Sequence, residues 1–153
     1  MTESTTIVRS ITIAARSEQI QPYIADLHKW ASWSPWEGQD PQLKRTYTGI
    51  PGSVGSTYEW NGNRKAGAGT MIVTRALPAE VDVDLRFTAP FKSTSSVDFR
   101  LHETGSTTQV IWTMTSPQNL MAKVMRIFIN MEKLIGTDFE KGLAKLKAVV
   151  ENG

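Results

Sequence analysis

Proton-transfer chemistry would need charged side chains. Four of them lie in segments whose alternating pattern predicts strands: Glu59, Asp84, Arg86 and Asp98. A carboxylate buried in an apolar pocket can reach a pKa near neutrality and act as a general acid or base. Strand parity, however, sends each of these residues to the opposite face from its apolar neighbours. We therefore expect all four to face solvent. An inward-facing, desolvated member of the group would instead favour an enzyme.

Three aromatic side chains with polar atoms are expected to face inward, namely Tyr58, Trp60 and Trp112. Their O–H and N–H groups can orient a ligand as readily as they can assist a reaction. The two histidines, His28 and His102, are expected to face solvent at the ends of a helix and a strand. They are too far apart in the sequence to suggest a metal site, so we expect no bound metal.

Several classes of active site are excluded by composition. The chain has no cysteine, which excludes thiol catalysis, disulfides and iron–sulfur ligation. No GxSxG nucleophile elbow occurs, and the GAGTM segment is not followed by the lysine of a phosphate-binding loop. We interpret its Gly67 and Gly69 as a hairpin turn and a close approach to the tryptophan-rich loop. No residue cluster implies a cofactor.

That loop, residues 30–41, has the sequence WASWSPWEGQDP. Trp30, Trp33 and Trp36 could stack on a ring-shaped ligand, anchor to a membrane surface, or pin the loop to the sheet and close one end of the fold. The last interpretation is favoured for Trp30 and Trp33, and less so for Trp36. The loop's charged residues are both acidic, which argues against nucleic acid and against an anionic membrane.

Length and charge point to one ordinary globular domain, residues 1–153. The formal net charge is +2, too small for a nucleic-acid binder, and 40% of the residues are hydrophobic. No stretch approaches the ~20 apolar residues of a membrane span. The N-terminus lacks the basic start and apolar run of a signal peptide. We expect a soluble, cytoplasmic protein that binds no nucleic acid and does not insert stably into membranes.

The order of elements predicted from periodicity and turn residues is a strand, short helices, six strands and a long helix. Ser17 is expected to cap the first helical region, which Pro22 should divide or kink. Ser116 and Pro117 are expected to start the long helix, which the two glycines at 136 and 142 weaken by about 1 kcal/mol each. A bend near Gly136, with Thr137 capping a second helix, is left open. The expected ranges are strands 5–13, 43–48, 56–61, 67–76, 81–89, 94–102 and 107–115, and helical segments 17–29 and 117–150.

Seven antiparallel strands with one apolar face need a cover, and one long helix is available for it. A strongly curved sheet around that helix leaves a space that the short helices and the tryptophan loop would close. The sequence therefore predicts an apolar cavity, although a place in the packed core is an equally good interpretation for any one residue. The expected lining is Trp36, Tyr58, Trp60, Phe87, Phe99, Trp112, Met114, Met121, Met125 and Phe128.

Short segments of the chain, in order, resemble the polyketide cyclase/dehydratase-like branch of the START-like (SRPBCC) superfamily from Arg9 to Val150. The resemblance implies an α+β helix-grip fold: a seven-stranded, strongly curved antiparallel sheet wrapped around a long C-terminal helix, with two short helices after the first strand. It also implies a deep hydrophobic cavity, but no particular reaction. The segments are RSITIAA, IQPYIADLHKWASWSPW, DPQLKRTYTG, GSTYEWNGN, GAGTMIV, PFKS and GTDFEKGLAKLK.

Members of that superfamily include lipid and sterol carriers, hormone binders, aromatase/cyclases and ATPase-stimulating co-chaperones. Our leading hypothesis is a bacterial-type domain that binds a small hydrophobic or aromatic, lipid- or polyketide-like ligand as a carrier, sensor or sequestering module. One alternative is a polyketide cyclase or dehydratase that uses acid and hydroxyl groups of the pocket. Another is a co-chaperone-like interaction domain with a filled core and an exposed apolar patch. We expect a monomer or a homodimer.

Overall fold

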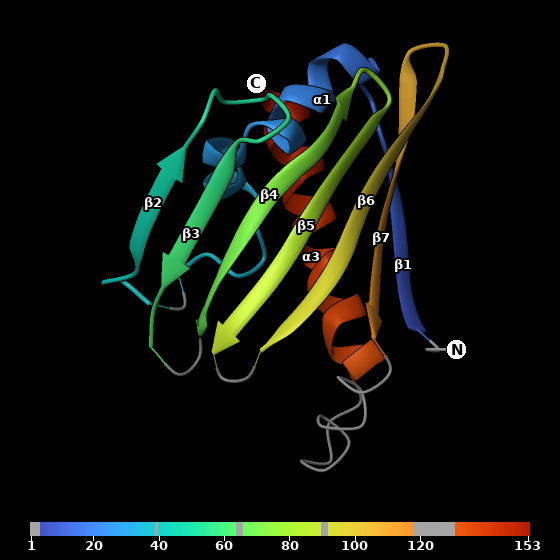
Figure 1. Ribbon diagram of the computed structural model, residues 1–153. Helices are drawn as coiled ribbons and strands as arrows, with labels where there is room; N and C mark the ends of the chain where they lie inside the picture. Colours follow the sequence, from blue (N-terminus) through green and yellow to red (C-terminus); the bar gives the residue numbers. More distant parts are fainter. Residues whose placement is uncertain (1–3, 39, 64–65, 90–91, 118–130) are drawn as a thin grey trace.

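The computed structural model describes residues 4–38, 40–63, 66–89, 92–117 and 131–153, and these residues form one antiparallel sheet with helices on one of its faces (Figure 1). The strand order is β1-β7-β6-β5-β4-β3-β2, so the first two strands of the chain form opposite edges. The sheet is open and curled, and its register shifts twice between β4 and β5, as β-bulges do. The strands are β1 (Ser4–Ile13), β2 (Lys44–Thr48), β3 (Thr57–Asn61), β4 (Ala68–Leu77), β5 (Glu80–Ala89), β6 (Ser93–Thr104) and β7 (Thr107–Pro117).

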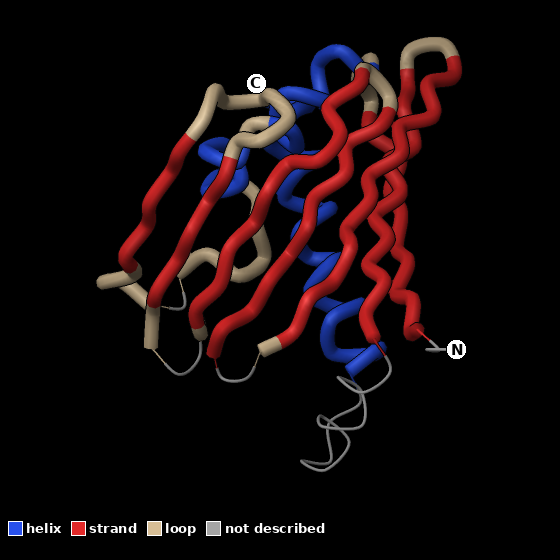
Figure 2. Tube along the Cα trace, in the orientation of Figure 1, coloured by secondary structure: helices blue, strands red, loops and turns tan. Residues whose placement is uncertain are grey.

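The helices α1 (Ser17–Ala25), η1 (Leu27–Ser32, a 3-10 helix) and α3 (Met131–Asn152) all lie on one side of the sheet (Figure 2). We call the face of the sheet that they cover the inner face. The α+β helix-grip architecture predicted from the sequence is thereby confirmed. No helix among the described residues is both long enough and apolar enough to cross a bilayer.

Alternation along the strands assigns each residue to a face as predicted. On β5, Val81, Val83 and Leu85 are buried, while Asp82 and Asp84 between them are half-exposed. Successive side chains of a strand point to opposite faces, so one apolar set must face the helices and the other set meets water. The same pattern holds on β6 and β7.

The break in the first helical region is confirmed, since α1 ends at Ala25 and η1 follows. Pro22 lies inside α1 and the helix continues only three residues beyond it. The predicted capping by Ser17 is wrong, because Ser17 is the first helical residue and Arg16 holds the cap position. Glu103, at the β6–β7 hairpin, accepts hydrogen bonds from the Ser17 backbone N–H (2.7 Å) and hydroxyl (3.1 Å). A carboxylate from a distant hairpin therefore satisfies the helix N-terminus.

The predicted start of the long helix at Pro117 is also wrong. Pro117 still belongs to β7, opposite Ser4 on β1, and the Ser116 hydroxyl lies 2.8 Å from that of Ser95. Strand pairing with β1 continues to this point and overrides the local N-cap signal. Helix α3 runs unbroken from Met131 to Asn152, so the helix does not break at Gly136 and Thr137 does not cap a second helix. A bend near Gly136 stays a prediction.

One stripe of α3 packs into the concave sheet. Phe139, Leu143 and Leu146, spaced four and three residues apart, are each at most 1% exposed. Phe139 stacks on Trp112 of β7, with ring centroids 3.9 Å apart and planes 6° from parallel. We call this packed group of rings the tryptophan cluster; it comprises Trp30, Trp33, Trp36, Phe99, Trp112 and Phe139.

Candidate functional site

A second group of rings, separate from the tryptophan cluster, crosses the inner face near the β2 edge. Each ring contacts the next: centroids are 3.8 Å apart for His28 and Tyr47, 4.9 Å for Tyr47 and Tyr58, 5.9 Å for Tyr58 and Trp60, and 5.6 Å for Trp60 and Phe87. The first three pairs are stacked and the last meets edge to face. We call these five residues the aromatic row. None of the five is fully buried, so apolar ring surface remains accessible on this part of the inner face.

Strand register builds the aromatic row. Tyr47 on β2 lies directly opposite Tyr58 on β3, and directly paired residues project to the same face. Trp60, two residues further along β3, lies opposite Gly69 on β4, which in turn lies opposite Phe87 on β5. A Cβ atom on Gly69 would be 2.6 Å from Cη2 of Trp60. The missing side chain therefore lets the indole cross β4 and reach Phe87.

The predicted close approach at Gly69 is thus made to Trp60 and not to the tryptophan loop, while Gly67 has the positive φ of 66° expected in the turn. The indole N–H of Trp60 donates to the Ala66 carbonyl at 3.0 Å. This bond holds the ring in place, and it uses the donor that the sequence suggested for a ligand.

An ion pair joins the β2 end of the aromatic row to the tryptophan loop. The two terminal guanidinium nitrogens of Arg45, Nη2 and Nη1, contact the Glu37 carboxylate oxygens at 2.7 and 3.1 Å. Such a bidentate pair fixes orientation as well as charge. The hydrogen bond to Glu37 raises the pKa of Arg45 above its already high value. Burial raises the pKa of Tyr58 to about 12, and the neighbouring positive charge of Arg45 opposes that rise. Tyr58 therefore stays a neutral phenol at physiological pH.

The remaining predicted lining residues lie in different surroundings. Phe99, Trp112 and Met114 are at most 4% exposed and belong to the packed core. Trp36 is half-buried, and its indole N–H donates to Asp138 on α3 at 3.1 Å. Met121, Met125 and Phe128 lie outside the described residues.

Trp30 and Trp33 pin the loop as expected. Their indole N–H groups donate to the carbonyls of Ile24 and Tyr23, at 2.7 and 2.8 Å. Both rings are buried, at 7% and 0% exposure. They are therefore part of the packing that closes this end of the fold.

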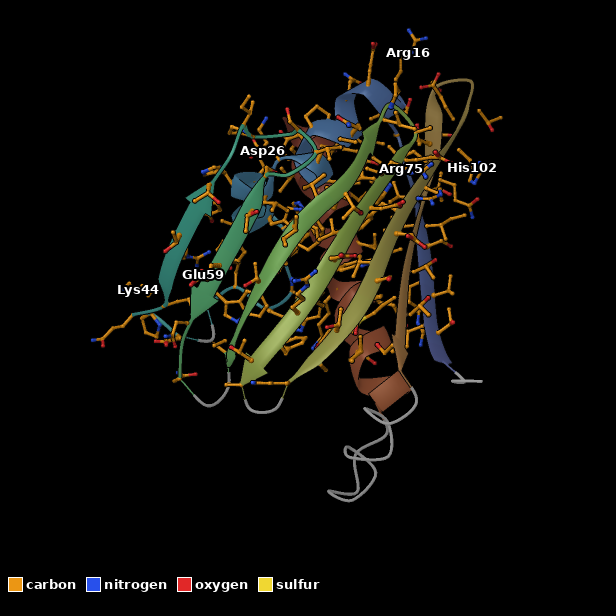
Figure 3. The ribbon with its side chains drawn as sticks, viewed as in Figure 1. Arg16, Asp26, Lys44, Glu59, Arg75 and His102 are labelled. Carbon is orange, nitrogen blue, oxygen red and sulfur yellow. The ribbon has the colours of Figure 1, made fainter. Side chains whose placement is uncertain are left out.

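The charged candidates for acid–base chemistry face away from the aromatic row. Glu59 is exposed on the outer face of β3, where Figure 3 labels it, and Lys44 extends away from the sheet at the β2 edge. Asp84 lies 3.9 Å from Arg86. Burial and the neighbouring Asp82 carboxylate raise the pKa of Asp98, but this residue pairs with Asp82 on the outer face. Within the described parts of the chain, no cluster of three histidine or carboxylate side chains could hold a metal ion.

Sequence reasoning missed three residues of this region. Arg45 and Tyr47 lie two residues apart in the segment KRTYT, so strand parity alone would have placed both side chains on the same face. His28 is exposed as expected, yet its ring stacks on Tyr47 and its Nδ1 lies 3.2 Å from Asp26. No local signal predicts that stack, because it joins η1 to a strand that follows nearly twenty residues later.

Comparison with known proteins gives the same fold throughout. A family model described as polyketide cyclase/dehydrase and lipid transport matches residues 4–151. The Aha1 dimer from Colwellia psychrerythraea is similar at 20% identity, with 96% of each chain covered and a TM-score of 0.68. Protein CV1439 from Chromobacterium violaceum is 16% identical, with 95% and 96% covered and a TM-score of 0.66. Protein SA2116 from Staphylococcus aureus, described as of unknown function, is 14% identical, with 99% and 96% covered and a TM-score of 0.68. No curated protein sequence matches the chain significantly.

Proposed function

Because the chain belongs to the polyketide cyclase/dehydrase and lipid transport family, we propose that it binds a small hydrophobic or aromatic ligand on the inner face of the sheet. The ligand lies against the aromatic row and extends toward the covering helix. In this proposal Tyr58, Trp60, Phe87 and Trp36 contact the ligand, and the buried rings of the tryptophan cluster support them.

The observation that carries the proposal is the contrast between the two groups of rings. In the tryptophan cluster, Trp33, Phe99 and Phe139 are almost completely buried by each other and by the helices. In the aromatic row, Tyr47 and Tyr58 remain half-exposed although they face the same side of the sheet. Partly exposed flat rings aligned in one row favour a flat or elongated apolar molecule, which would remove them from water.

The charged side chains favour binding over catalysis. The carboxyl candidates for acid–base chemistry, Glu59 and Asp84, lie on the outer face of the sheet and away from the ligand. Two carboxylates lie near the row: Glu37 is paired with Arg45, and Asp26 contacts the ring Nδ1 of His28 and accepts a hydrogen bond from its backbone N–H. The phenol of Tyr58 and the guanidinium of Arg45 orient a ligand rather than transfer its protons. A carrier, sensor or sequestering role fits these groups better than a cyclase or dehydratase.

The proposal places this binding domain in the cytoplasm, as a monomer or a homodimer. The similar Aha1 structure is described as a dimer. A co-chaperone-like role through the surface remains the competing proposal. It requires a contiguous apolar patch, and Ile50 and Val54, both in the β2–β3 connection, are its nearest counterpart at 73% and 64% exposure.

Native mass spectrometry of gently purified protein, followed by denaturing extraction, tests the proposal. We expect an adduct of a few hundred daltons, and quenching of tryptophan fluorescence by at least one member of a panel of fatty acids, sterols and flavonoids. Tyr58→Leu should weaken binding about threefold to tenfold, because a ring stack contributes about 0.5–1.5 kcal/mol. Glu59→Gln, one residue along the strand and on the other face, is the matched control and should bind normally.

Absence of both an adduct and a fluorescence change would count against ligand binding and for the surface-acting alternative. Equal weakening by Tyr58→Leu and Glu59→Gln would place the ligand elsewhere on the molecule.

A further inference from the structure

We infer that the ligand is an uncharged molecule with an oxygen group at one end, and that this oxygen is bound by the hydroxyl of Ser93 and by one hydroxyl of the Ser95–Ser116 pair. The inference rests on the proposed function, since it assigns the polar end of the same inner-face site. We call these three residues the serine group.

Two rows of directly paired residues cross the inner face and end in the serine group. The first runs from Trp60 through Gly69 and Phe87 to Ser93. The second runs from Tyr58 through Met71, Leu85 and Ser95, and Ser116 lies beside Ser95 on β7. Paired residues share a face, so the first row changes from aromatic rings to a hydroxyl as it crosses the sheet, and the second changes from an aromatic ring through aliphatic side chains to hydroxyls.

The length of each row across the strands limits the size of the ligand. Neighbouring strands lie about 4.8 Å apart, so the backbones of Trp60 on β3 and Ser93 on β6 are separated by about 14 Å along the sheet. A molecule with its rings on Phe87, the β5 end of the aromatic row, reaches the serine group on the next strand, whereas one that also covers Tyr58 or Trp60 must cross β4 and β5. The inner face there offers it apolar groups, Met71 and Leu85.

Ser93 is the member of the group that most directly implies an occupant. Its Oγ is buried and has no hydrogen-bond partner among the described residues. A buried hydroxyl without a partner is costly, and such groups in native structures call for an explanation. Ser56 and Trp112 also have buried unpartnered polar atoms, but Ser56 precedes β3 in the β2–β3 connection and Trp112 is stacked on Phe139 in the tryptophan cluster, so neither lies at the end of the two rows. Ser93 instead lies opposite Phe87, which still has accessible surface.

The Ser95–Ser116 pair adds a second donor. The two hydroxyl oxygens are 2.8 Å apart, so one hydroxyl donates to the other and the proton of the acceptor remains available. Both residues are buried, at 2% and 6% exposure. Together with Ser93, they offer two O–H donors to one oxygen atom at the end of the rows.

The charges of the residues along the rows decide whether the ligand's oxygen belongs to a neutral group or to a carboxylate. In the two rows from β3 to β7 every polar group is an uncharged hydroxyl or phenol or an indole. At the end of the rows away from the serine group, the guanidinium of Arg45, opposite Trp60, is already bound by both oxygens of Glu37. A buried carboxylate without a cation would lose its hydration without compensation. The rows therefore fit a ketone, ester or alcohol and disfavour an acid.

Three probes with the same two-ring skeleton test this inference: methyl naphthyl ketone, isopropylnaphthalene and naphthoate, each titrated by tryptophan fluorescence. We expect the ketone to bind about threefold to tenfold more tightly than the hydrocarbon of the same shape, and naphthoate to bind most weakly. Ser93→Ala should abolish the advantage of the ketone and leave hydrocarbon binding unchanged. Ser96→Ala, exposed on the outer face of the same strand, is the matched control and should keep it.

The outcomes separate the two proposals. Equal binding of ketone and hydrocarbon, a preference retained in Ser93→Ala, or tightest binding of naphthoate would each overturn the role of the serine group while the binding function stands. If the wild-type protein bound none of the probes, this inference would fail, and the native mass spectrometry above would decide whether the proposed function fails with it. Ser116→Ala provides a second variant, expected to reduce the ketone preference, should Ser93→Ala fold poorly.

Discussion

The Arg9 guanidinium lies against the backbone of Gly136, in the space that a side chain at that position would occupy. A Cβ atom there would be 3.0 Å from Nε of Arg9 and closer to the rest of the guanidinium. Arg9 passes this point to reach Glu140, one turn further along α3, at 2.9 Å. Gly136, which the sequence suggested as a weak point of the helix, therefore leaves room for the Arg9 side chain of β1 to reach α3.

For Gly136→Ala we predict almost no change in the free energy of unfolding, within about 0.5 kcal/mol. Alanine favours the helix by about 1 kcal/mol, but the new methyl group displaces Arg9 from Glu140, an exposed ion pair that contributes about 0–1 kcal/mol. Urea denaturation of a double-mutant cycle tests this. In the Arg9→Gln background the same change should stabilise by the full helix-propensity term of about 1 kcal/mol. Additive effects would show that Arg9 and Gly136 are not coupled.

Gly142→Ala should destabilise the protein, unlike Gly136→Ala, although Gly142 lies in the interior of the same helix. Its Cβ would be 2.8 Å from Cδ of Pro35 and 3.2 Å from Cζ3 of Trp112, a proline ring and a buried indole that have little room to move. Overpacking costs about 1–3 kcal/mol, which offsets or exceeds the helix-propensity gain. We expect a net loss of unfolding free energy of about 1 kcal/mol in urea denaturation. A stabilised variant would rule out tight packing at this position.

Tyr58 should make the stability of the protein fall with pH in the alkaline range. Burial raises the pKa of its phenol from 10.0 to about 12. Between these two pH values the unfolded chain releases the proton and the folded protein retains it, so unfolding becomes more favourable as pH rises. Tyr58→Phe should remove this part of the slope, measured by urea denaturation across the range. Tyr23→Phe on α1 is the control. An unchanged slope in Tyr58→Phe would contradict the assignment.

The bidentate pair between Arg45 and Glu37 should be sensitive to a lysine, because an ammonium group cannot bind both carboxylate oxygens in the same planar geometry. We predict that Arg45→Lys lowers the free energy of unfolding by about 1 kcal/mol, as for a charge-assisted hydrogen bond in a partly buried site. Arg86→Lys, whose ion pair with Asp84 is long at 3.9 Å, should change it by less than about 0.5 kcal/mol. Equal effects of the two changes in chemical denaturation would argue against a special role for Arg45.

The outer face contains an unfavourable carboxylate pair. Asp82 and Asp98 lie directly opposite each other on β5 and β6, and Arg100 (2.6 Å) and Arg75 (3.2 Å) both bind Asp82. Burial and the Asp82 charge raise the pKa of Asp98 above its ordinary value. A carboxyl group whose pKa is higher in the folded state lowers stability as pH rises from its unfolded value near 3.9 to the folded-state pKa, and the loss is complete above the latter.

Asp98→Asn should therefore stabilise the protein at neutral pH, and the gain should shrink as the pH falls toward 4. Thermal unfolding at several pH values measures this dependence. Asp84→Asn, on the same outer face but beside Arg86, is the matched control. A gain from Asp98→Asn that did not depend on pH would indicate that charge repulsion is not its origin.

Local periodicity was sufficient for the strands and their faces. The segment EVDVDLRFT assigns Val81, Val83 and Leu85 to the core and Asp82 and Asp84 to the outer face, as the structure has them. This succeeds because the alternation of side chains along a strand is a property of the backbone itself. Parity also placed Tyr58 and Trp60 on one face, and their role in ligand binding stays a prediction.

Local signals failed where a distant group occupied the position that they implied. Ser17 resembles a helix cap, but Glu103 supplies the acceptor, and Pro117 remains in β7 because β1 pairs with it. Gly136 and Gly142 were predicted only to weaken the helix, and Gly69 to approach the tryptophan loop. Each one instead admits a side chain from elsewhere in the fold.

The sequence by itself thus determined the order of the elements and the inner and outer face of each strand, because these follow from backbone geometry and the need to bury one apolar face, and its resemblance to a known superfamily implied the helix-grip architecture. Only the tertiary structure decided which inward rings are packed core and which form the aromatic row, and it placed the hydroxyl of Ser93 at the other end of that row. Those relationships depend on the register between strands distant in sequence and on how far α3 extends over the sheet. No local pattern encodes them, since each is set by the packing of the whole domain.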